Sequence, residues 1–217
     1  MDTLSRELAV EKERCAILYV DVQYNNVYPE GGQYVSEDLT PKEAKSKYKY
    51  FFDSLHHTAL PNMAKLQKIS RKNKIEILYT TIESLTYDGR DRGLDYKISG
   101  FNIAKDSKNA KIAKEIKPIN DEIIFKKSSS SPFISTNLHY ILGNLNVKYL
   151  VVCGLLSDQC ISSTVRDACD LGYFVTLVTD ACTTYSEARH TQSIDHIKGY
   201  CRQVTTDEFL EEITSNT

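Results

Sequence analysis

The residue best suited to chemistry is Cys160, at the point where a buried strand gives way to a helix. Residues 149–153, YLVVC, form a short apolar run typical of a strand buried on both faces. Apolar residues then recur at helical spacing until Gly172, and Ser157 or Asp158 is available as N-cap. Free N–H groups in a first helical turn favour a thiolate and can hold an oxyanion, so this setting predicts a nucleophile that attacks a carbonyl. The alternative is a small buried hydrophobe, the usual role of a free cysteine.

Two further strand ends carry charged groups. Asp21 directly follows the apolar run 14–20, and Lys126 and Lys127 follow the run 122–125. In an open α/β sheet, ligands bind beyond the carboxyl ends of the strands, which makes these side chains candidates for the same site. A capping aspartate and solvated lysines are the alternatives, and position alone does not choose between the two lysines.

The elements that must position these residues form a repeating pattern of strands and helices. Six strand-like runs alternate with helical segments: residues 14–20, 76–81, 122–125, 149–153, 174–179 and 202–204. This alternation predicts an α/β fold, a three-layer doubly wound sheet of about six mostly parallel strands with helices on both faces. In the common strand order 3-2-1-4-5-6, the first and fourth strands are neighbours at the switch point where a crevice opens. Asp21 and Cys160 follow those two strands.

The stretches between strands are less regular. Residues 42–73 are predicted to form two helices separated near Pro61, because proline fits the first turn of a helix better than its interior. Residues 82–108 show no clear periodicity, and a loop of that length in a compact domain is usually a functional rim or lid. Within it, Arg90 and Arg92 are either a clamp for an anionic substrate group or surface ion-pair partners.

Composition narrows the class of protein. With 27 Lys and Arg against 29 Asp and Glu, the net charge of −2 gives no reason to expect a nucleic acid or a membrane surface as partner. No apolar run is long enough to span a bilayer and the first residues lack a signal-peptide pattern, so a cytoplasmic location is expected. The six cysteines lack zinc-ligand spacing, which predicts reduced thiols and no metal.

Three motifs resemble the isochorismatase-like cysteine hydrolase superfamily. They are AILYVDVQ at 16–23, KSSSSPF at 127–133 and GLLSDQCISSTVRDA at 154–168. The last is the most specific, and the resemblance extends from residue 16 to about 209. It implies one domain over residues 1–217 with an N-terminal extension at 1–14.

The resemblance also implies a catalytic triad of Asp21, Lys127 and Cys160, and thereby selects Lys127 over Lys126. Asp21 would be the general base, Lys127 would stabilise negative charge, and Cys160 would form a covalent thioester. A cis peptide between Leu155 and Leu156 would accompany an oxyanion hole made by the N–H groups of Leu156 and Cys160. The implied reaction is hydrolysis of a non-peptide C–N bond in a small amide, ureido or N-carbamoyl compound, without a cofactor.

Substrate contacts and assembly are less constrained. Gln23, Tyr24, Glu83 and Arg90 are the candidate substrate-binding residues. Members of the nicotinamidase type hold a metal through an aspartate and closely spaced histidines, and no such set occurs here. Members commonly form homodimers or homotetramers, and the same is expected of this chain.

Three other functions remain open. Ether hydrolysis of isochorismate is one, although true isochorismatases of this superfamily lack the cysteine. A catalytically silent binding module on the same fold is another, since fold does not fix function. Thiol redox chemistry would need a resolving cysteine, and the nearest in sequence are Cys153 and Cys169.

Overall fold

A six-stranded parallel sheet in the order β3-β2-β1-β4-β5-β6 forms the middle layer of the computed structural model, which describes residues 4–215. The strands are β1 (Cys15–Val20), β2 (Glu76–Ile82), β3 (Ile123–Lys127), β4 (Tyr149–Leu155), β5 (Phe174–Thr183) and β6 (Arg202–Val204). All five neighbouring pairs are parallel. Both the predicted fold class and the predicted strand order are confirmed.

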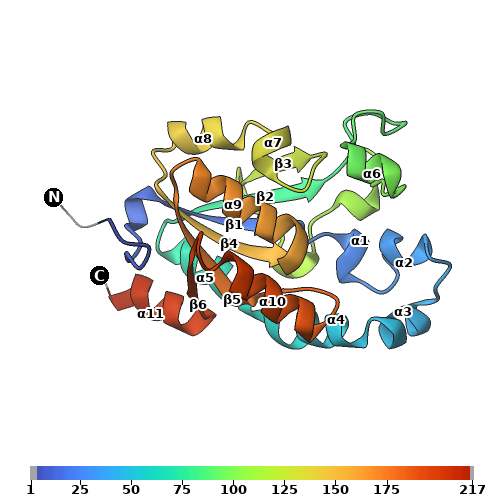
Figure 1. Ribbon diagram of the computed structural model, residues 1–217, viewed down its shortest axis with the longest axis horizontal. Helices are drawn as coiled ribbons and strands as arrows, with labels where there is room; N and C mark the ends of the chain where they lie inside the picture. Colours follow the sequence, from blue (N-terminus) through green and yellow to red (C-terminus); the bar gives the residue numbers. More distant parts are fainter. Residues whose placement is uncertain (1–3, 216–217) are drawn as a thin grey trace.

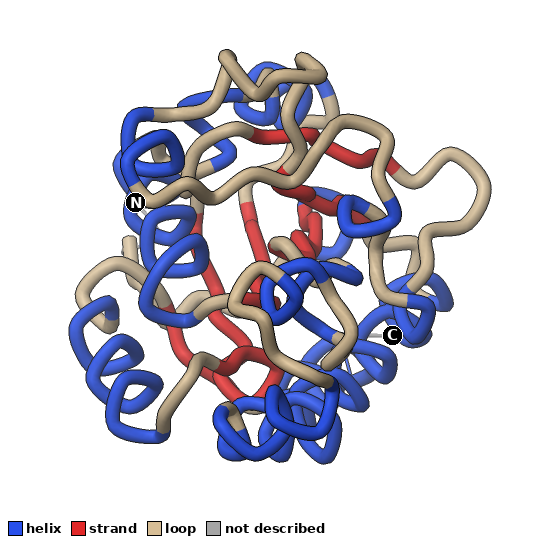
Figure 2. Tube along the Cα trace, turned by 90° about the vertical axis from the view of Figure 1, so that its right-hand side faces the viewer, coloured by secondary structure: helices blue, strands red, loops and turns tan. Residues whose placement is uncertain are grey.

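Helices cover both faces of the sheet (Figures 1 and 2). The α-helices are α1 (Tyr24–Val27), α2 (Gly32–Val35), α3 (Pro41–Lys47), α4 (Lys49–Ser54), α5 (Leu60–Lys72), α6 (Leu94–Ile98), α7 (Pro132–Ser135), α8 (Leu138–Asn144), α9 (Ser162–Asp170), α10 (Glu187–Ile197) and α11 (Thr206–Ser215). Helix α5 contacts α11 in one layer, and α9 contacts α7 and α10 in the other. Figure 1 shows α1, α2 and α6 beyond the carboxyl ends of the strands. None of the helices described is long and apolar enough to cross a membrane.

The two central strands explain why the carboxyl edge forms a site. Every residue of β1 and of β4 is buried, as their continuous apolar sequences predict. Val20 pairs with Gly154 in the register of these strands. A Cβ at residue 154 would lie 2.3 Å from the carbonyl oxygen of Val20, and the φ of Gly154 is +125°. Only glycine permits this approach, which brings the ends of β1 and β4 together.

The connection before β2 differs from the prediction. Helix α3 ends before Tyr48, and a π-helical turn, η2 (Leu55–Ala59), joins α4 to α5 without a break. Pro61 lies in the first turn of α5, directly after the π-helical turn. The predicted separation near Pro61 is therefore wrong, although the preference of proline for a first turn is met.

The long segment after β2 contains one short helix, α6, and ends in two 3-10 turns, η3 (Lys108–Ala110) and η4 (Lys114–Ile116). The segment before β1 contains a further 3-10 turn, η1 (Lys12–Arg14). It packs against α11 through the N–H of Val10, which donates to Glu212. The first three residues of the predicted N-terminal extension lie outside the described residues.

Candidate active site

Asp21 directly follows β1 in a left-handed backbone conformation, with φ of 54°, which aspartate adopts more readily than most residues. The hydroxyl of Thr80 on β2 donates to Oδ1 of Asp21 over 2.7 Å. Its other oxygen, Oδ2, makes no hydrogen bond of standard geometry with the described residues. One carboxylate oxygen is thus held by β2, and the other faces Lys127.

Lys127 is fully buried although it ends the edge strand β3. Its Nζ lies 2.8 Å from Oδ2 of Asp21, 2.7 Å from the carbonyl oxygen of Ser129 and 3.3 Å from Sγ of Cys160. Burial by itself would lower the pKa of Lys127, but Asp21 and the sulfur outweigh it, and the pKa is raised. Lys127 therefore carries a positive charge against the sulfur. The neighbouring Lys126 points the other way, as strand alternation requires, and pairs with Glu83.

Cys160 lies in a π-helical turn, η5 (Ser157–Ile161), that leads directly into α9. The predicted side-chain caps of this turn are wrong, because Ser157 Oγ contacts Nδ1 of His190 over 2.8 Å and Asp158 accepts from Thr184. Burial raises the pKa of the Cys160 thiol to about 12, opposed by Lys127 and reinforced by Asp21. Burial thus acts against the thiolate that the helix end is expected to favour, and Lys127 acts for it.

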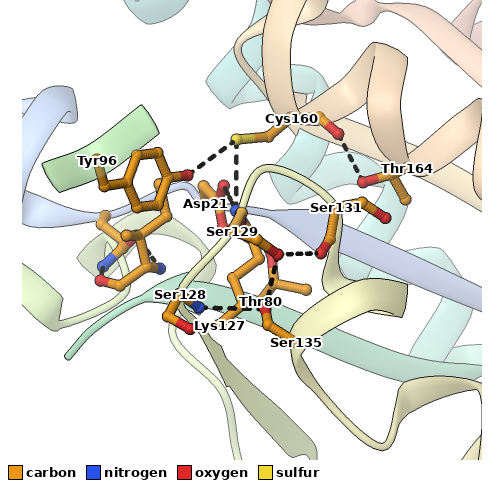
Figure 3. Close-up of polar contacts among 12 residues, drawn as sticks. Asp21, Thr80, Tyr96, Lys127, Ser128, Ser129, Ser131, Ser135, Cys160 and Thr164 are labelled. Atoms are coloured by element: carbon orange, nitrogen blue, oxygen red, sulfur yellow. Dashed lines mark hydrogen bonds and ion pairs between the residues drawn. The ribbon is translucent and has the colours of Figure 1, made fainter. Parts of the chain in front are cut away.

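The structure thus brings together Asp21, Lys127 and Cys160, the three residues predicted to form the triad (Figure 3). The peptide bond between Leu155 and Leu156 is cis, at the predicted position. The arrangement combines a cysteine sulfur, a carboxyl group and a positive charge. Such a set can move one proton and stabilise one negative charge at sulfur.

Sequence reasoning missed Tyr96, whose hydroxyl lies 4.0 Å from Sγ of Cys160. Tyr96 belongs to α6 and is 8% exposed, and its burial raises its pKa. Figure 3 shows its ring pointing toward the sulfur from the side opposite the sheet. No periodic pattern marks α6 in the sequence, so only the three-dimensional path of the 82–108 segment reveals this contact.

A cavity of about 650 Å³ opens onto Asp21 and Cys160. Its walls come from β-strand ends, from α1 and α2, and from the segment around α6. The lining residues are Asp21, Asn25, Asn26, Gly32, Gln33, Ser36, Glu37, Ile82, Asp95, Tyr96, Ser99, Gly100, Phe101, Asn102, Asn109, Leu155, Leu156, Gln159, Cys160 and Tyr185. The size suits a small organic molecule.

None of the four predicted substrate contacts lines this cavity. The side-chain amide of Gln23 donates to the carbonyl oxygen of Ile82 over 3.0 Å and accepts from the N–H of Ile82 over 2.8 Å. The hydroxyl of Tyr24 accepts from Lys108.

Glu83 is buried against Lys126, and Arg90 pairs with Asp88 on the surface. The four residues hold the loops that surround the site, and their contact with substrate stays a prediction. Residues 4–215 also contain no group of three His, Cys, Asp or Glu side chains able to hold a metal ion.

Comparison with known proteins places the chain in a family. The family model of the isochorismatase domain matches residues 15–209. A probable inactive nicotinamidase from Arabidopsis thaliana is 31% identical over 163 residues, which is 71% of this chain and 82% of that protein. N-carbamoylsarcosine amidase from Arthrobacter sp is 31% identical over 121 residues, 54% of this chain and 46% of that protein.

The matched part also spans only 43% of an uncharacterized isochorismatase family protein from Bacillus subtilis, so the chain covers about half the length of these two relatives or less. Among solved structures, a cysteine hydrolase from Pseudomonas syringae superposes over 100% of both chains with a TM-score of 0.82 and 21% identity. N-carbamoylsarcosine amidase from Thermoplasma acidophilum superposes with a TM-score of 0.68 over 89% of this chain and 97% of that one, at 21% identity. These two likenesses concern the fold. The family match is carried by the sequence, and the chain belongs to the isochorismatase family.

Proposed function

We propose that the protein is a cysteine amidohydrolase that cleaves the C–N bond of a small amide or ureido compound through a thioester on Cys160. The observation that carries the proposal is the contact of Lys127 Nζ with both Asp21 and Cys160, at 2.8 Å and 3.3 Å, at the base of a cavity. Relatives named N-carbamoylsarcosine amidase and ureidoacrylate amidohydrolase support the type of bond cleaved, the C–N bond of an amide or ureido group.

The reaction begins with a proton transfer. As Sγ of Cys160 attacks the carbonyl carbon, Asp21 takes the thiol proton, and the charge of Lys127 stabilises the sulfur while it is anionic. The carbonyl oxygen becomes an oxyanion, for which the N–H groups of Leu156 and Cys160 are the proposed donors. Collapse of this intermediate breaks the C–N bond, and Asp21 returns its proton to the leaving nitrogen.

The second half releases the acid. Asp21 removes a proton from water, the resulting hydroxyl attacks the thioester carbon, and the C–S bond breaks. The sulfur leaves as a thiolate beside Lys127 and regains a proton from Asp21. The sum is amide plus water giving acid plus amine, with no net change in the enzyme. No step requires a metal, so dialysis against a chelator is expected to leave the rate unchanged.

Acyl transfer offers a direct test. The parent protein is incubated with a panel of primary amides and ureido compounds, and ammonia release and acyl transfer to added hydroxylamine are measured. Acid-quenched protein is then examined by mass spectrometry for an acyl group on Cys160. Cys160→Ala and Cys160→Ser should fold but give neither product nor adduct.

The alternatives make different predictions in the same assay. Turnover by Cys160→Ala above a trace would exclude the nucleophile. A folded parent protein that releases no ammonia from any compound and forms no adduct would favour a silent binding module.

A further inference from the structure

We propose that the cavity selects amides that are uncharged or carry an ammonium group, and that it rejects amides carrying a carboxylate. The inference rests on the proposed function, because it concerns what the same cavity admits to Cys160. It starts from one property of the wall: none of the residues that line the cavity is Lys, Arg or His.

The two arginines of the surrounding loop are engaged elsewhere, and none of its lysines lines the cavity. Arg90 pairs with Asp88 over 3.0 Å on the surface. Arg92 donates to the carbonyl oxygens of Gly89 and Phe101, at 2.8 Å and 2.7 Å. Of the two uses left open for these arginines, ion pairing and contacts within the loop are the ones observed, because their guanidinium groups hold the loop itself.

The charged groups on the wall are all carboxylates: Asp21, Glu37 and Asp95. Lys127 balances Asp21, and Lys47 balances Glu37 over 2.6 Å. Asp95, exposed on α6, has no cation within ion-pair distance among the described residues 4–215. The unbalanced charge at the cavity is negative.

The neutral part of the wall offers hydrogen-bond acceptors. Six of the lining side chains are carboxamides: Asn25, Asn26, Gln33, Asn102, Asn109 and Gln159. The amide nitrogen of Asn26 donates to the carbonyl oxygen of Asp21 over 3.4 Å, which identifies the other amide atom as the oxygen. That oxygen is buried and makes no hydrogen bond within the described residues. Asn26 lines the cavity without a positive charge, and this oxygen, as an acceptor, cannot donate to a carboxylate.

Desolvation decides which ligands this wall accepts. A carboxylate entering the cavity would lose hydration without meeting a cation, and Asp95 would repel it. An ammonium group would meet Asp95, and an uncharged group would lose little hydration. The cavity would discriminate as much by leaving a carboxylate without a cationic partner as by its contacts to an accepted amide.

A matched series of substrates tests the proposal. Succinamate, butanamide and β-alaninamide have similar length and differ in a terminal carboxylate, methyl or ammonium group. We expect kcat/KM for succinamate to be at least about tenfold lower than for either of the other two. Succinamate as the best substrate of the three would overturn the proposal.

Alkylation of Cys160 gives a second readout that needs no hydrolysis. Rates with neutral iodoacetamide and anionic iodoacetate are compared at Cys160 and normalised to the same pair of rates for a small free thiol. We expect the normalised rate with iodoacetate to be at least about fivefold lower than with iodoacetamide. Equal or faster labelling by iodoacetate would overturn the proposal, since Lys127 would then attract anions through the cavity.

The two readouts separate this inference from the proposed function. Hydrolysis of no compound in the amide and ureido panel, with no acyl adduct, together with slow labelling by iodoacetate, would refute the amidohydrolase and support the charge preference. Good hydrolysis of succinamate would refute the charge preference and support the amidohydrolase.

Substitutions of Asp95 test whether its charge causes the discrimination against carboxylates. Asp95→Lys should raise the normalised iodoacetate rate and the relative kcat/KM for succinamate by at least about threefold, and Asp95→Asn should change them in the same direction by less. Asp88→Asn is the control, because Asp88 lies in the same loop but does not line the cavity. A shift as large in Asp88→Asn as in Asp95→Lys would assign the effect to overall charge and overturn the proposal.

Discussion

Nζ of Lys127 lies 2.8 Å from Oδ2 of Asp21, and neither side chain is more than 2% exposed. Lys127 is the last residue of β3, and Asp21 directly follows β1. These two strands are not adjacent, and Thr80 of β2, which lies between them, donates to the carboxylate of Asp21. Taking two charges out of water is costly, and their attraction offsets that cost only with good geometry and further hydrogen bonds. The carbonyl oxygen of Ser129 supplies one such bond to Lys127. The two charges of this pair act in opposite directions on Cys160, since Asp21 raises the pKa of its thiol and Lys127 lowers it.

The proposed proton transfer predicts a specific kinetic effect of Asp21→Asn. Asparagine keeps the shape of the side chain but cannot carry the proton from sulfur to the leaving nitrogen. We expect kcat to fall by at least ~100-fold with a much smaller change in KM, because general acid–base groups commonly contribute about 10²–10⁴ in rate. Steady-state kinetics on any accepted amide measure it. Turnover within a few-fold of the parent would remove Asp21 from the mechanism even if Cys160 proved essential.

Lys127→Met and Lys126→Met form a matched pair for stability. Removing Lys127 leaves the carboxylate of Asp21 buried without its partner, so we expect a loss of about 3–5 kcal/mol in the free energy of unfolding. Lys126 is half exposed and pairs with Glu83, and its removal should cost about 1 kcal/mol or less. Urea denaturation measures both. Similar losses in the free energy of unfolding in the two variants would mean that the buried pair of Lys127 and Asp21 is no more stabilising than the pair of Lys126 and Glu83.

The regular part of this fold follows from the sequence because its signals are local. Continuous apolar runs mark β1 and β4, which are buried on both faces, and the alternation of strands with helices leads to the observed order of the sheet. That strand order alone predicts that Asp21 and Cys160 lie at the same site. It does not select Lys127, because strand position leaves Lys126 equally eligible; the family resemblance made the choice.

The cavity wall could not be predicted in the same way. Tyr96 and Asp95 belong to a one-turn helix inside a long loop, where no periodicity indicates which side chains face inward. Gln23 and Glu83, predicted as substrate contacts, do not line the cavity. They turn instead to backbone groups and to Lys126, because buried polar atoms must be satisfied wherever the loops pack.

The raised pKa of the Cys160 thiol predicts how the fraction of thiolate at this residue depends on pH. Burial raises the pKa of the folded thiol to about 12 from its ordinary value of 9.0, so the neutral form should dominate throughout the neutral range. The difference in ultraviolet thiolate absorbance between the parent and Cys160→Ser should therefore show no step between about pH 6 and 9. The raised pKa also means that this group stabilises the fold below pH 9.0 and loses that contribution as pH rises toward 12. A titration step below about pH 8 would indicate a resting thiolate and leave Asp21 without a first proton to accept.

Gly154 is predicted to be the backbone position on which the site depends, and Gly143 provides its control. A Cβ at residue 154 would lie 2.3 Å from the carbonyl oxygen of Val20, in a backbone conformation with φ of +125° that alanine rarely adopts. Gly154→Ala should therefore lower the free energy of unfolding by at least ~2 kcal/mol.

The effect should also reach catalysis, since relief of the clash must separate the ends of β1 and β4, which carry Asp21 and the loop of Cys160. In Gly143→Ala the new methyl group meets no atom within 4 Å and replaces a glycine inside α8, so stability should rise by up to about 1 kcal/mol with activity unchanged. Thermal or urea unfolding and amide turnover are measured for both variants. A loss in Gly154→Ala alone would assign the effect to the close approach of the two strands, whereas a loss in both would assign it to any added methyl group. Equal stability of Gly154→Ala and the parent would show that the strand ends can separate without loss, and the triad would then need another explanation for its precise spacing.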